Sequence, residues 1–196
     1  MKFILKSIVA RRINLLFYFT FLIFVTCLSQ DIIETDIFTV CYSQKLEQPL
    51  WLEYEIRCID GSFSRKGMSF KKNQDYHTSD NLDYKNNVWD KGHLAPAATF
   101  NCSKDMLLET FTFLNCALQH NKLNQGPWSS LEEYERQLSK THNVRGKIDL
   151  VFNEQSLVLQ TGATVPSFFI KTIYFNRDSL VVRFPNQDVS GINWRE

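Results

Sequence analysis

Two apolar runs joined by a polar turn constrain the fold of this chain more than any other feature of its sequence. The first run covers residues 38–43, the second covers residues 50–57, and the turn between them covers residues 44–49. In the second run Leu, Leu, Tyr and Ile alternate with Trp, Glu, Glu and Arg. Because alternation with a period of two is typical of a strand with one buried face, the two runs predict a β-hairpin.

The residues after the hairpin predict a surface excursion, a short helix and one more strand. Residues 60–88 are rich in Asp, Asn, Lys and Ser, which is typical of an exposed connection. Ser103 precedes the apolar residues 106–108 as an N-cap would, so we expect a short helix over residues 103–110. Residues 111–116 have the composition of a strand.

A longer helix is expected to begin at Pro127, because a first helical turn does not need the missing N–H of proline. Apolar residues then recur every three or four positions from Trp128 to Leu138, which is the stripe of an amphipathic helix. Strands in runs with few helices between them indicate an α+β domain with a largely antiparallel sheet. Four further strands are expected, over residues 148–152, 156–161, 168–175 and 180–184.

Residues 1–29 differ in kind from the rest of the chain. Four Lys or Arg residues precede an apolar run from Ile13 to about Leu28, and polar sequence begins at Asp31. This order is typical of a secretory signal peptide, with cleavage expected near Ser29. The run is shorter than the roughly 20 apolar residues that cross a bilayer, but an uncleaved membrane anchor is one alternative and a mitochondrial targeting segment is another. We therefore expect residues 30–196 to form a single secreted domain.

Removal of residues 1–29 would also change the charge of the protein. That segment carries four of the 22 Lys and Arg residues and none of the 21 Asp and Glu residues, so the remainder has a net charge of about −3. A protein of this charge has no general attraction for anions. A nucleic-acid site would therefore have to be a local basic patch.

Four cysteines remain after such a cleavage, namely Cys41, Cys58, Cys102 and Cys116. An even number of cysteines in a secreted chain favours disulfides. Of the possible connectivities we favour Cys41–Cys58 with Cys102–Cys116, because each pair is expected on neighbouring elements. Buried thiols are the alternative.

The segment Asp90-Lys91-Gly92-His93 brings a histidine together with two opposite charges and a glycine. A neutral imidazole has an unperturbed pKa of roughly 6.5 and can accept a proton from water near pH 7, so His93 is a candidate general base. Gly92 would let the backbone bend sharply, and Lys91 would supply a positive charge. A second segment follows: Leu123-Asn124-Gln125-Gly126-Pro127-Trp128, then Leu131-Glu132 and Arg136.

Together with Asn115-Cys116-Ala117-Leu118-Gln119, these segments resemble the signature of the DNA/RNA nonspecific endonuclease family. That signature reads D-R-G-H, then N-x-x-P-Q, then L-N-Q-x-x-W-x-x-L-E. The resemblance covers roughly residues 38–185, and three motifs in order with family-like spacing carry it. Further matches are Thr161-Gly162 and Val165-Pro166-Ser167, followed by Phe169 and Lys171.

The resemblance implies a ββα-metal (His-Me finger) fold with His93 at the end of a strand and Asn124 opening the crossing helix. It implies that His93 is the general base and that Asn124 is the one side chain bound to a divalent ion, Mg²⁺ or in its place Mn²⁺. Glu132 would hold water of the ion's shell, since Mg²⁺ keeps most of its waters. Phosphate contacts would come from Lys91, Arg136 and Arg65, and Asn115 and Gln119 would lie near the site.

The implied activity is metal-dependent, sequence-nonspecific hydrolysis of DNA or RNA to 5′-phosphate products, without an organic cofactor. The alternative is a noncatalytic binder of nucleic acid or protein that keeps the nuclease fold. Without the resemblance, His93 would be a structural or surface histidine and Asn124 a helix cap. Glu132 would be a solvated carboxylate, paired with Arg136 four residues on.

Three features depart from the family pattern. Lys91 replaces the usual Arg and loses the two-pronged grip of a guanidinium on phosphate. Leu118 replaces the usual Pro between Asn115 and Gln119. The sequence is also short at the C-terminus, about thirty residues beyond residues 165–167.

Overall fold

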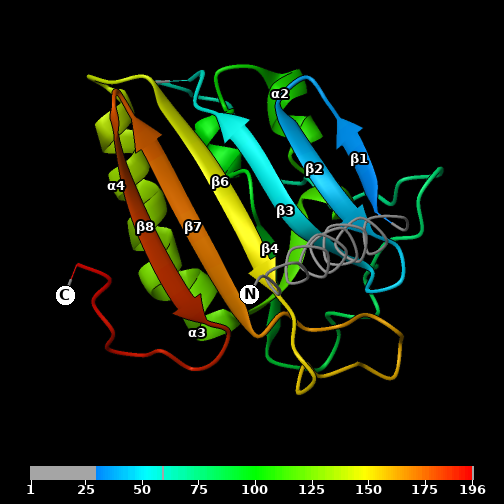
Figure 1. The fold of residues 1–196 in the computed structure, drawn as a ribbon. Coiled ribbons are helices and arrows are strands. Elements are labelled where there is room, and N and C mark those ends of the chain that lie inside the picture. The colour runs from blue at the N-terminus through cyan, green and yellow to red at the C-terminus, as the bar shows by residue number, and fades with distance from the viewer. Residues whose placement is uncertain (1–29, 59, 196) are drawn as a thin grey trace, which may run out of the picture. The chain divides into compact units, whose positions relative to one another are not determined.

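The computed structural model describes residues 30–58 and 60–195, so the predicted signal peptide at residues 1–29 lies outside the described residues. A six-stranded antiparallel sheet in the order β1-β2-β3-β6-β7-β8 forms one layer of the domain (Figure 1). Across the described ranges, no helix is both long enough and apolar enough to cross a membrane. The strands are β1 (Asp31–Glu34), β2 (Phe38–Ser43), β3 (Gln48–Glu55), β6 (Val144–Val151), β7 (Phe168–Phe175) and β8 (Asp178–Pro185).

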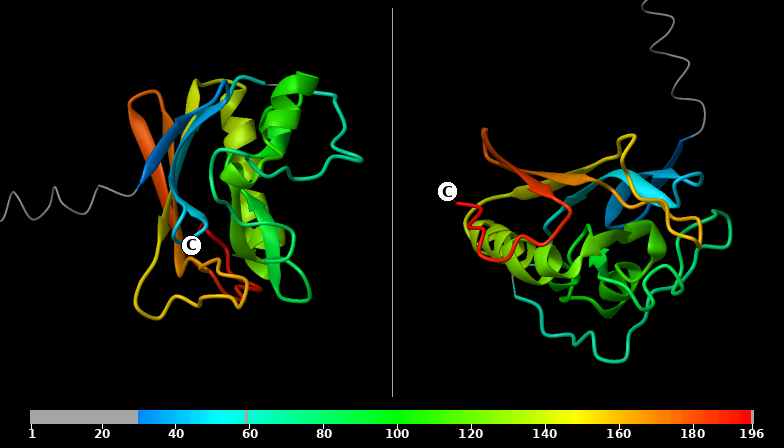
Figure 2. Two further views of the ribbon diagram at one scale, coloured as in Figure 1. Left: turned by 90° about the vertical axis from the view of Figure 1, so that its right-hand side faces the viewer. Right: turned by 90° about the horizontal axis from the view of Figure 1, so that it is seen from below.

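The smaller elements lie together on one face of this sheet, as both views in Figure 2 show. Strands β4 (Trp89–His93) and β5 (Cys116–His120) pair with each other as a second, two-stranded sheet. The amide N–H of Leu118 donates a hydrogen bond of 3.0 Å to the Gln48 side chain and so ties β5 to β3. The helical segments are η2 (Ala97–Thr99), α2 (Lys104–Glu109), η3 (Phe113–Asn115), α3 (Asn121–Leu123), η4 (Asn124–Trp128) and α4 (Ser129–Ser139).

Most of the predicted elements are confirmed. The hairpin is β2 and β3, the Ser103 side chain caps α2, and residues 168–175 form β7 as expected. Residues 156–161 do not form a strand, because Val158 makes only an isolated bridge to Thr164 and has no neighbouring strand to pair with. Residues 111–116 are also not a strand: the side chain of Thr112 accepts a hydrogen bond from the Leu114 amide and starts the turn η3.

The apolar core lies between the large sheet and α4. Trp128 and Leu131 at the start of α4 are completely buried. The Trp128 ring packs edge-on against Phe169 of β7 and Phe184 of β8, with ring centroids 5.5 and 5.9 Å apart. These contacts fix the N-terminal half of α4 on the sheet.

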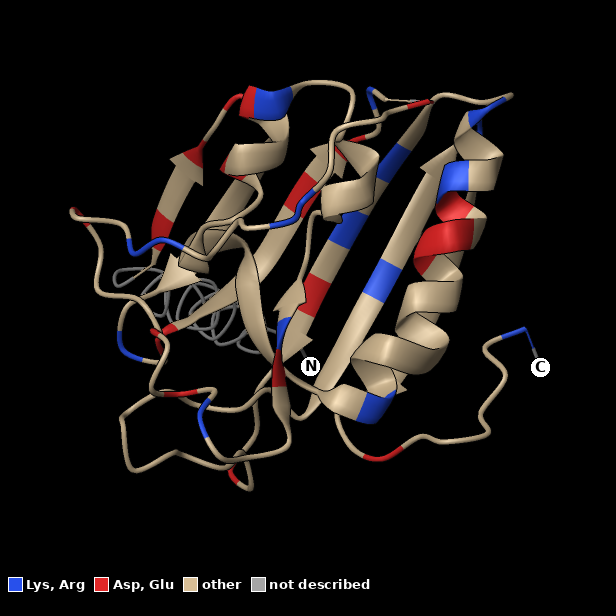
Figure 3. Cartoon of the chain, turned by 180° about the vertical axis from the view of Figure 1, so that it is seen from behind, with Lys and Arg blue, Asp and Glu red and all other residues tan. Residues whose placement is uncertain are grey.

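A buried ion pair continues this attachment further along α4. The Lys171 ammonium of β7 lies 2.6 Å from Oε2 of Glu135 of α4, and both residues are at most 1% exposed. The hydroxyl of Tyr54 on β3 donates a hydrogen bond of 2.6 Å to the other oxygen of Glu135. One carboxylate therefore joins the helix to two strands; Figure 3 shows the acidic residues gathered along the middle of α4.

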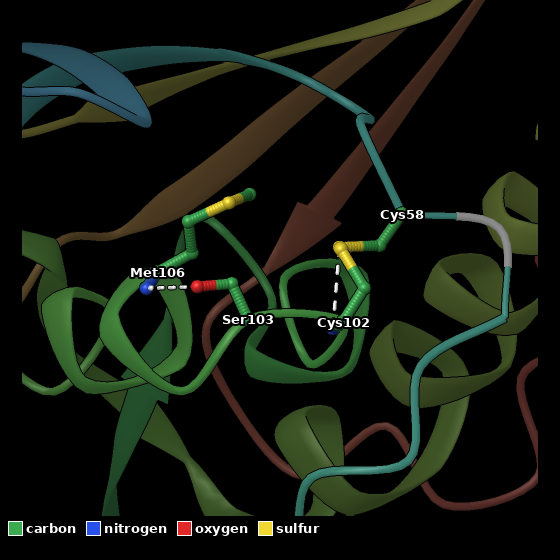
Figure 4. The surroundings of a disulfide bond; sticks show 4 residues. All are labelled: Cys58, Cys102, Ser103 and Met106. Carbon is green, nitrogen blue, oxygen red and sulfur yellow. Dashed lines mark hydrogen bonds between the residues drawn. A yellow bond between two sulfur atoms is a disulfide. The ribbon is translucent and has the colours of Figure 1, made fainter.

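The disulfide pairing differs from the predicted one. Cys58 is bonded to Cys102 in the described structure, and Cys41 and Cys116 are buried thiols (Figure 4). Cys41 lies opposite Trp51 in the β2–β3 register, so Cys58 is seven positions farther along the chain. At about 3.3 Å per residue this separation is roughly 20 Å, beyond the reach of a disulfide.

We expect Lys171→Met to lower the free energy of unfolding by about 3–5 kcal/mol, because it leaves the Glu135 carboxylate buried without its counter-charge. The double variant Lys171→Met, Glu135→Leu should recover most of that loss, since no buried charge remains. Urea unfolding measures both. Lys147→Met is the matched control, because the half-buried Lys147–Glu53 pair at 3.4 Å contributes at most about 1 kcal/mol. A Lys171→Met loss no larger than the control would contradict the expectation.

Candidate active site

His93 is the last residue of β4 and lies opposite Cys116 of β5. Gly92 precedes it, and a Cβ atom at Gly92 would overlap the side chain of Gln119 on β5. Gly92 is therefore needed because the two strands pack closely. The sharp backbone bend that the sequence suggested is wrong, since Gly92 lies inside a regular strand and is not among the residues with positive φ.

The chain immediately after His93 is held by the buried side chain of Asn115. Its Oδ1 accepts a hydrogen bond of 2.7 Å from the Ala95 amide, and its Nδ2 donates to the carbonyl oxygens of Ala95 and Thr110 at 3.0 and 2.9 Å. The Leu94 amide donates to the Asn115 backbone carbonyl at 3.1 Å. This clamp fixes the backbone on the C-terminal side of His93.

Aromatic rings hold the imidazole of His93. The Phe70 ring lies 4.7 Å from it and the Phe111 ring 4.9 Å, measured between centroids. Although the residue is only half-buried, its Nε2 is shielded from solvent and has no hydrogen-bond partner in the described part of the chain. Burial, with a smaller contribution from the charge of Arg65, lowers the pKa of His93 to about 3. The imidazole is therefore neutral at pH 7 and can accept a proton.

Asn124 follows α3 at the start of η4, and its side chain is oriented by Asp90. Oδ2 of Asp90 accepts hydrogen bonds from Nδ2 of Asn124 at 2.9 Å and from Nε2 of Gln125 at 2.7 Å. Because the amide nitrogen of Asn124 is engaged, its carbonyl oxygen is left for another ligand. Gly126, with φ −107° and ψ −112°, interrupts the helix between Asn124 and α4.

Glu132 lies in the first turn of α4, and its Oε1 accepts a hydrogen bond of 2.9 Å from the indole N–H of Trp128. Burial raises the pKa of Glu132 to about 7, and the positive charge of Lys171 opposes that rise. The expected ion pair of Glu132 with Arg136 is not found among the described residues. Arg136 instead pairs with Glu133, with Nη2 2.5 Å from Oε2.

A cavity of about 690 Å³ brings most of the predicted site residues together. It lies between β4, the start of α4 and the residue 60–88 excursion; Arg136 is not part of its lining. The Lys91 side chain bonds to Oδ1 of Asn81, and its ammonium lies 5.6–5.9 Å from three aromatic rings. The predicted residues in the lining are Arg65, Lys91, His93, Asn124 and Glu132, joined by Lys66, Met68, Phe70, Phe111, Gln125 and Ser129.

The donor set of the cavity suits an ion that binds few protein groups. Within residues 30–58 and 60–195, no group of three or more His, Cys, Asp or Glu side chains could hold a metal ion. The side chain of Asn124 is oriented by its hydrogen bond to Asp90, and Glu132 lines the same cavity. The cavity therefore provides only a few oxygen ligands for an ion. Mg²⁺ fits such a site because it prefers oxygen ligands and retains several waters.

The sequence placed Asn115 near the site, but it did not reveal the supporting roles of Asp90 and Phe70. Asp90 was seen beside Lys91 and His93, but a hydrogen bond to a residue 34 positions away has no local signal. Phe70 lies in a polar stretch without periodicity, so nothing marked it as a neighbour of His93. An isolated aromatic residue within a polar excursion is the only hint that the sequence offered.

The chain is similar to known proteins over most of its length. The family model described as DNA/RNA non-specific endonuclease matches residues 23–196. The chain is 33% identical to mitochondrial endonuclease G of Bos taurus over 110 residues, which cover 54% of this chain and 37% of that protein. It is 28% identical to the mitochondrial nuclease EXOG of Homo sapiens over 157 residues, which cover 71% of this chain and 42% of that protein.

The fold is similar to that in a crystal structure of an EndoG/EndoGI complex. The TM-score is 0.74 at 23% sequence identity, and the match covers 81% of this chain and 75% of that chain. The α+β fold with a mostly antiparallel sheet, predicted from the sequence, is confirmed by this likeness. The chain spans less than half the length of the curated relatives it matches.

We expect the His93 ring to remain neutral well below pH 6.5, because its folded-state pKa is about 3. Since the unfolded chain binds this proton near pH 6.5 and the native chain does not, the contribution of His93 makes the protein less stable as pH falls below 6.5. An NMR titration of the histidine ring resonances measures the midpoint directly. A titration midpoint near 6.5 for His93 would contradict the conclusion that burial lowers its pKa.

Proposed function

The chain belongs to the DNA/RNA non-specific endonuclease family, and we propose that it hydrolyses phosphodiester bonds of DNA or RNA with the help of a divalent ion. One observation carries the proposal: a single cavity is lined by His93, Asn124 and Glu132 together with the cations Arg65 and Lys91. A base, an ion ligand and positive charges are what attack on a phosphodiester requires. A binding protein would have no need of a general base in this place.

In the proposed reaction His93 takes a proton from the water that attacks phosphorus. The Phe70 and Phe111 rings and the Asn115 clamp keep the imidazole in position. Lys91 and Arg65 bind the phosphate oxygens, because both cations line the same cavity. Arg136 lies outside the lining and contributes its positive charge from the next turn of α4, where it opposes the raised pKa of Glu132.

Asn124 would hold a Mg²⁺ ion through its amide oxygen. Mn²⁺ could replace Mg²⁺ there, because it also prefers oxygen ligands. When bound, the ion would stabilise the negative charge that develops on the phosphorus centre and the leaving 3′-oxygen, which gives 5′-phosphate products. Asp90 fixes the Asn124 amide by accepting its N–H. Glu132 is placed to accept hydrogen bonds from water in the cavity. No organic cofactor is needed for this chemistry.

Cleavage should be largely independent of sequence. The groups that line the cavity are suited to phosphate and to a hydrated ion, whereas sequence is read through hydrogen bonds to base edges. The nucleic acid would therefore be held by its backbone. Both DNA and RNA offer that backbone to the site.

We further propose that the protein is secreted after cleavage near Ser29. The Cys58–Cys102 disulfide supports an oxidising compartment. The names of relatives such as endonuclease G include the word mitochondrial, which favours the alternative of a mitochondrial targeting segment. Sequencing the N-terminus of the mature protein separates the two.

The function is tested by nicking of supercoiled plasmid with Mg²⁺, with chelator, and with a His93→Ala variant. Loss of a general base lowers the rate by about 10²–10⁴, and the variant should remain folded because the imidazole makes ring contacts and no described hydrogen bond. Chelator should abolish cleavage by the parent protein. A parent protein that binds DNA and leaves it intact under all conditions would instead favour the noncatalytic binder.

Asn124→Ala should weaken the dependence on Mg²⁺, because it removes the one side-chain oxygen proposed to bind the ion. We expect the Mg²⁺ concentration for half-maximal rate to rise at least tenfold, a loss typical of perturbing a metal site. Gln125→Ala is the matched control, since it breaks the neighbouring hydrogen bond to Asp90 and leaves Asn124 in place. An unchanged Mg²⁺ titration for Asn124→Ala would place the ion elsewhere.

A further inference from the structure

Residues 60–72, here called the basic arm, concentrate positive charge on a protein that is otherwise mildly acidic. The arm contains four Lys or Arg residues and one Asp, whereas residues 30–196 as a whole carry 18 basic and 21 acidic residues. The right-hand view of Figure 2 shows the chain after β3 as an open loop that projects from the layer of helices. The arm is thus a local basic patch of the kind that a nucleic-acid site on this protein requires.

The basic arm is anchored at both ends. At its start Cys58 is bonded to Cys102, and the Phe63 amide donates a hydrogen bond of 3.0 Å to the Asn101 carbonyl. At its end the Lys71 backbone exchanges hydrogen bonds with Phe111 and Phe113, at 2.9 and 3.1 Å. A loop held in this way loses little conformational entropy when it binds a ligand.

The tip of the basic arm reaches the catalytic cavity. Residues 65–68 form a turn, in which the Met68 amide donates to the Arg65 carbonyl at 3.1 Å and Gly67 takes the left-handed φ of 81°. Arg65, Lys66 and Met68 all line the cavity that contains His93. A nucleic-acid strand bound along the arm would therefore run into the cavity that contains His93.

The side chains of Phe63, Lys66 and Lys71 in the basic arm are exposed. Phe63 is 46% exposed, although aromatic residues are usually covered. Lys66 and Lys71 are exposed, and neither forms an ion pair with a described residue. By contrast, Lys72 is already paired with Asp80 at 2.9 Å. An exposed ring and unpaired cations on the same loop are the groups that bind a base and its neighbouring phosphates.

We propose that the basic arm is a binding surface for single-stranded nucleic acid, on which Phe63 stacks one base while Lys66 and Lys71 contact phosphates. A base in a duplex is already stacked between its neighbours, so only an unpaired base can use the Phe63 ring. The inference rests on the proposed nuclease function and extends it by naming single-stranded segments as preferred substrates. It also assigns to the arm a role in binding that is separate from the chemistry at His93.

The test measures binding, and it uses the full chain carrying His93→Ala so that the nucleic acid is not cleaved. The probes are a fluorescent single-stranded oligonucleotide and the matching duplex, followed by fluorescence anisotropy at several salt concentrations. Phe63→Ala should weaken binding of the single strand roughly tenfold, within the range for loss of one base–aromatic stack, and affect the duplex much less. Lys66→Ala and Lys71→Ala should each reduce the slope of log K against log salt by about 0.7.

Matched controls come from the same excursion outside the basic arm. Leu82 is 61% exposed and Lys85 is exposed, so Leu82→Ala and Lys85→Ala should leave both affinity and salt slope unchanged. Equal weakening of single strand and duplex by Phe63→Ala, or no change in any arm variant, would overturn the inference. Binding is measured without cleavage, so the anisotropy data can support binding by the arm even if the protein fails to nick plasmid. Conversely, the nuclease function can hold even if the arm variants bind as the parent does.

Discussion

The buried ion pair between Lys171 and Glu135 fixes α4 against the sheet, and the cavity depends on where α4 lies. Helix α4 carries Glu132, while Asn124 stands just before it across the Gly126 kink. A shift of the helix would therefore move two walls of the cavity relative to His93. Burying charges is costly unless their geometry is good, and here the Tyr54 hydroxyl satisfies the second carboxylate oxygen.

Burial shifts the two central titrating groups in opposite directions because it always disfavours the charged form. It lowers the pKa of the His93 imidazole and raises that of the Glu132 carboxyl. Both groups thus tend toward neutrality in a cavity that is also lined by three cations, Arg65, Lys66 and Lys91. Negative phosphate entering this cavity therefore meets positive charge that a fully ionised Glu132 would partly offset. The electrostatics therefore favour a polyanion even though the protein as a whole is slightly acidic.

The sequence predicted what local patterns encode and missed what depends on the path of the chain. The family resemblance predicted His93 at the end of a strand, which is β4, and Asn124 before a helix, which is α4. The Asp90–Asn124 hydrogen bond and the Phe70–His93 contact join distant segments, so no local pattern could indicate them. The disulfide pairing failed for the same reason. The strand expected at residues 156–161 failed because an apolar run needs a neighbouring strand to pair with.

The Cys58–Cys102 disulfide has a consequence for how the molecule responds to proteases. Residues 60–72 form an exposed loop with an unpaired apolar ring, and such loops are preferred sites of proteolytic nicking. Both ends of the 44-residue interval that contains this loop are joined covalently. A single cut there would leave the fragment with β1–β3 attached to the fragment with His93 and Asn124. The nicked protein would keep its apparent size in a nonreducing gel and separate into two chains only after reduction.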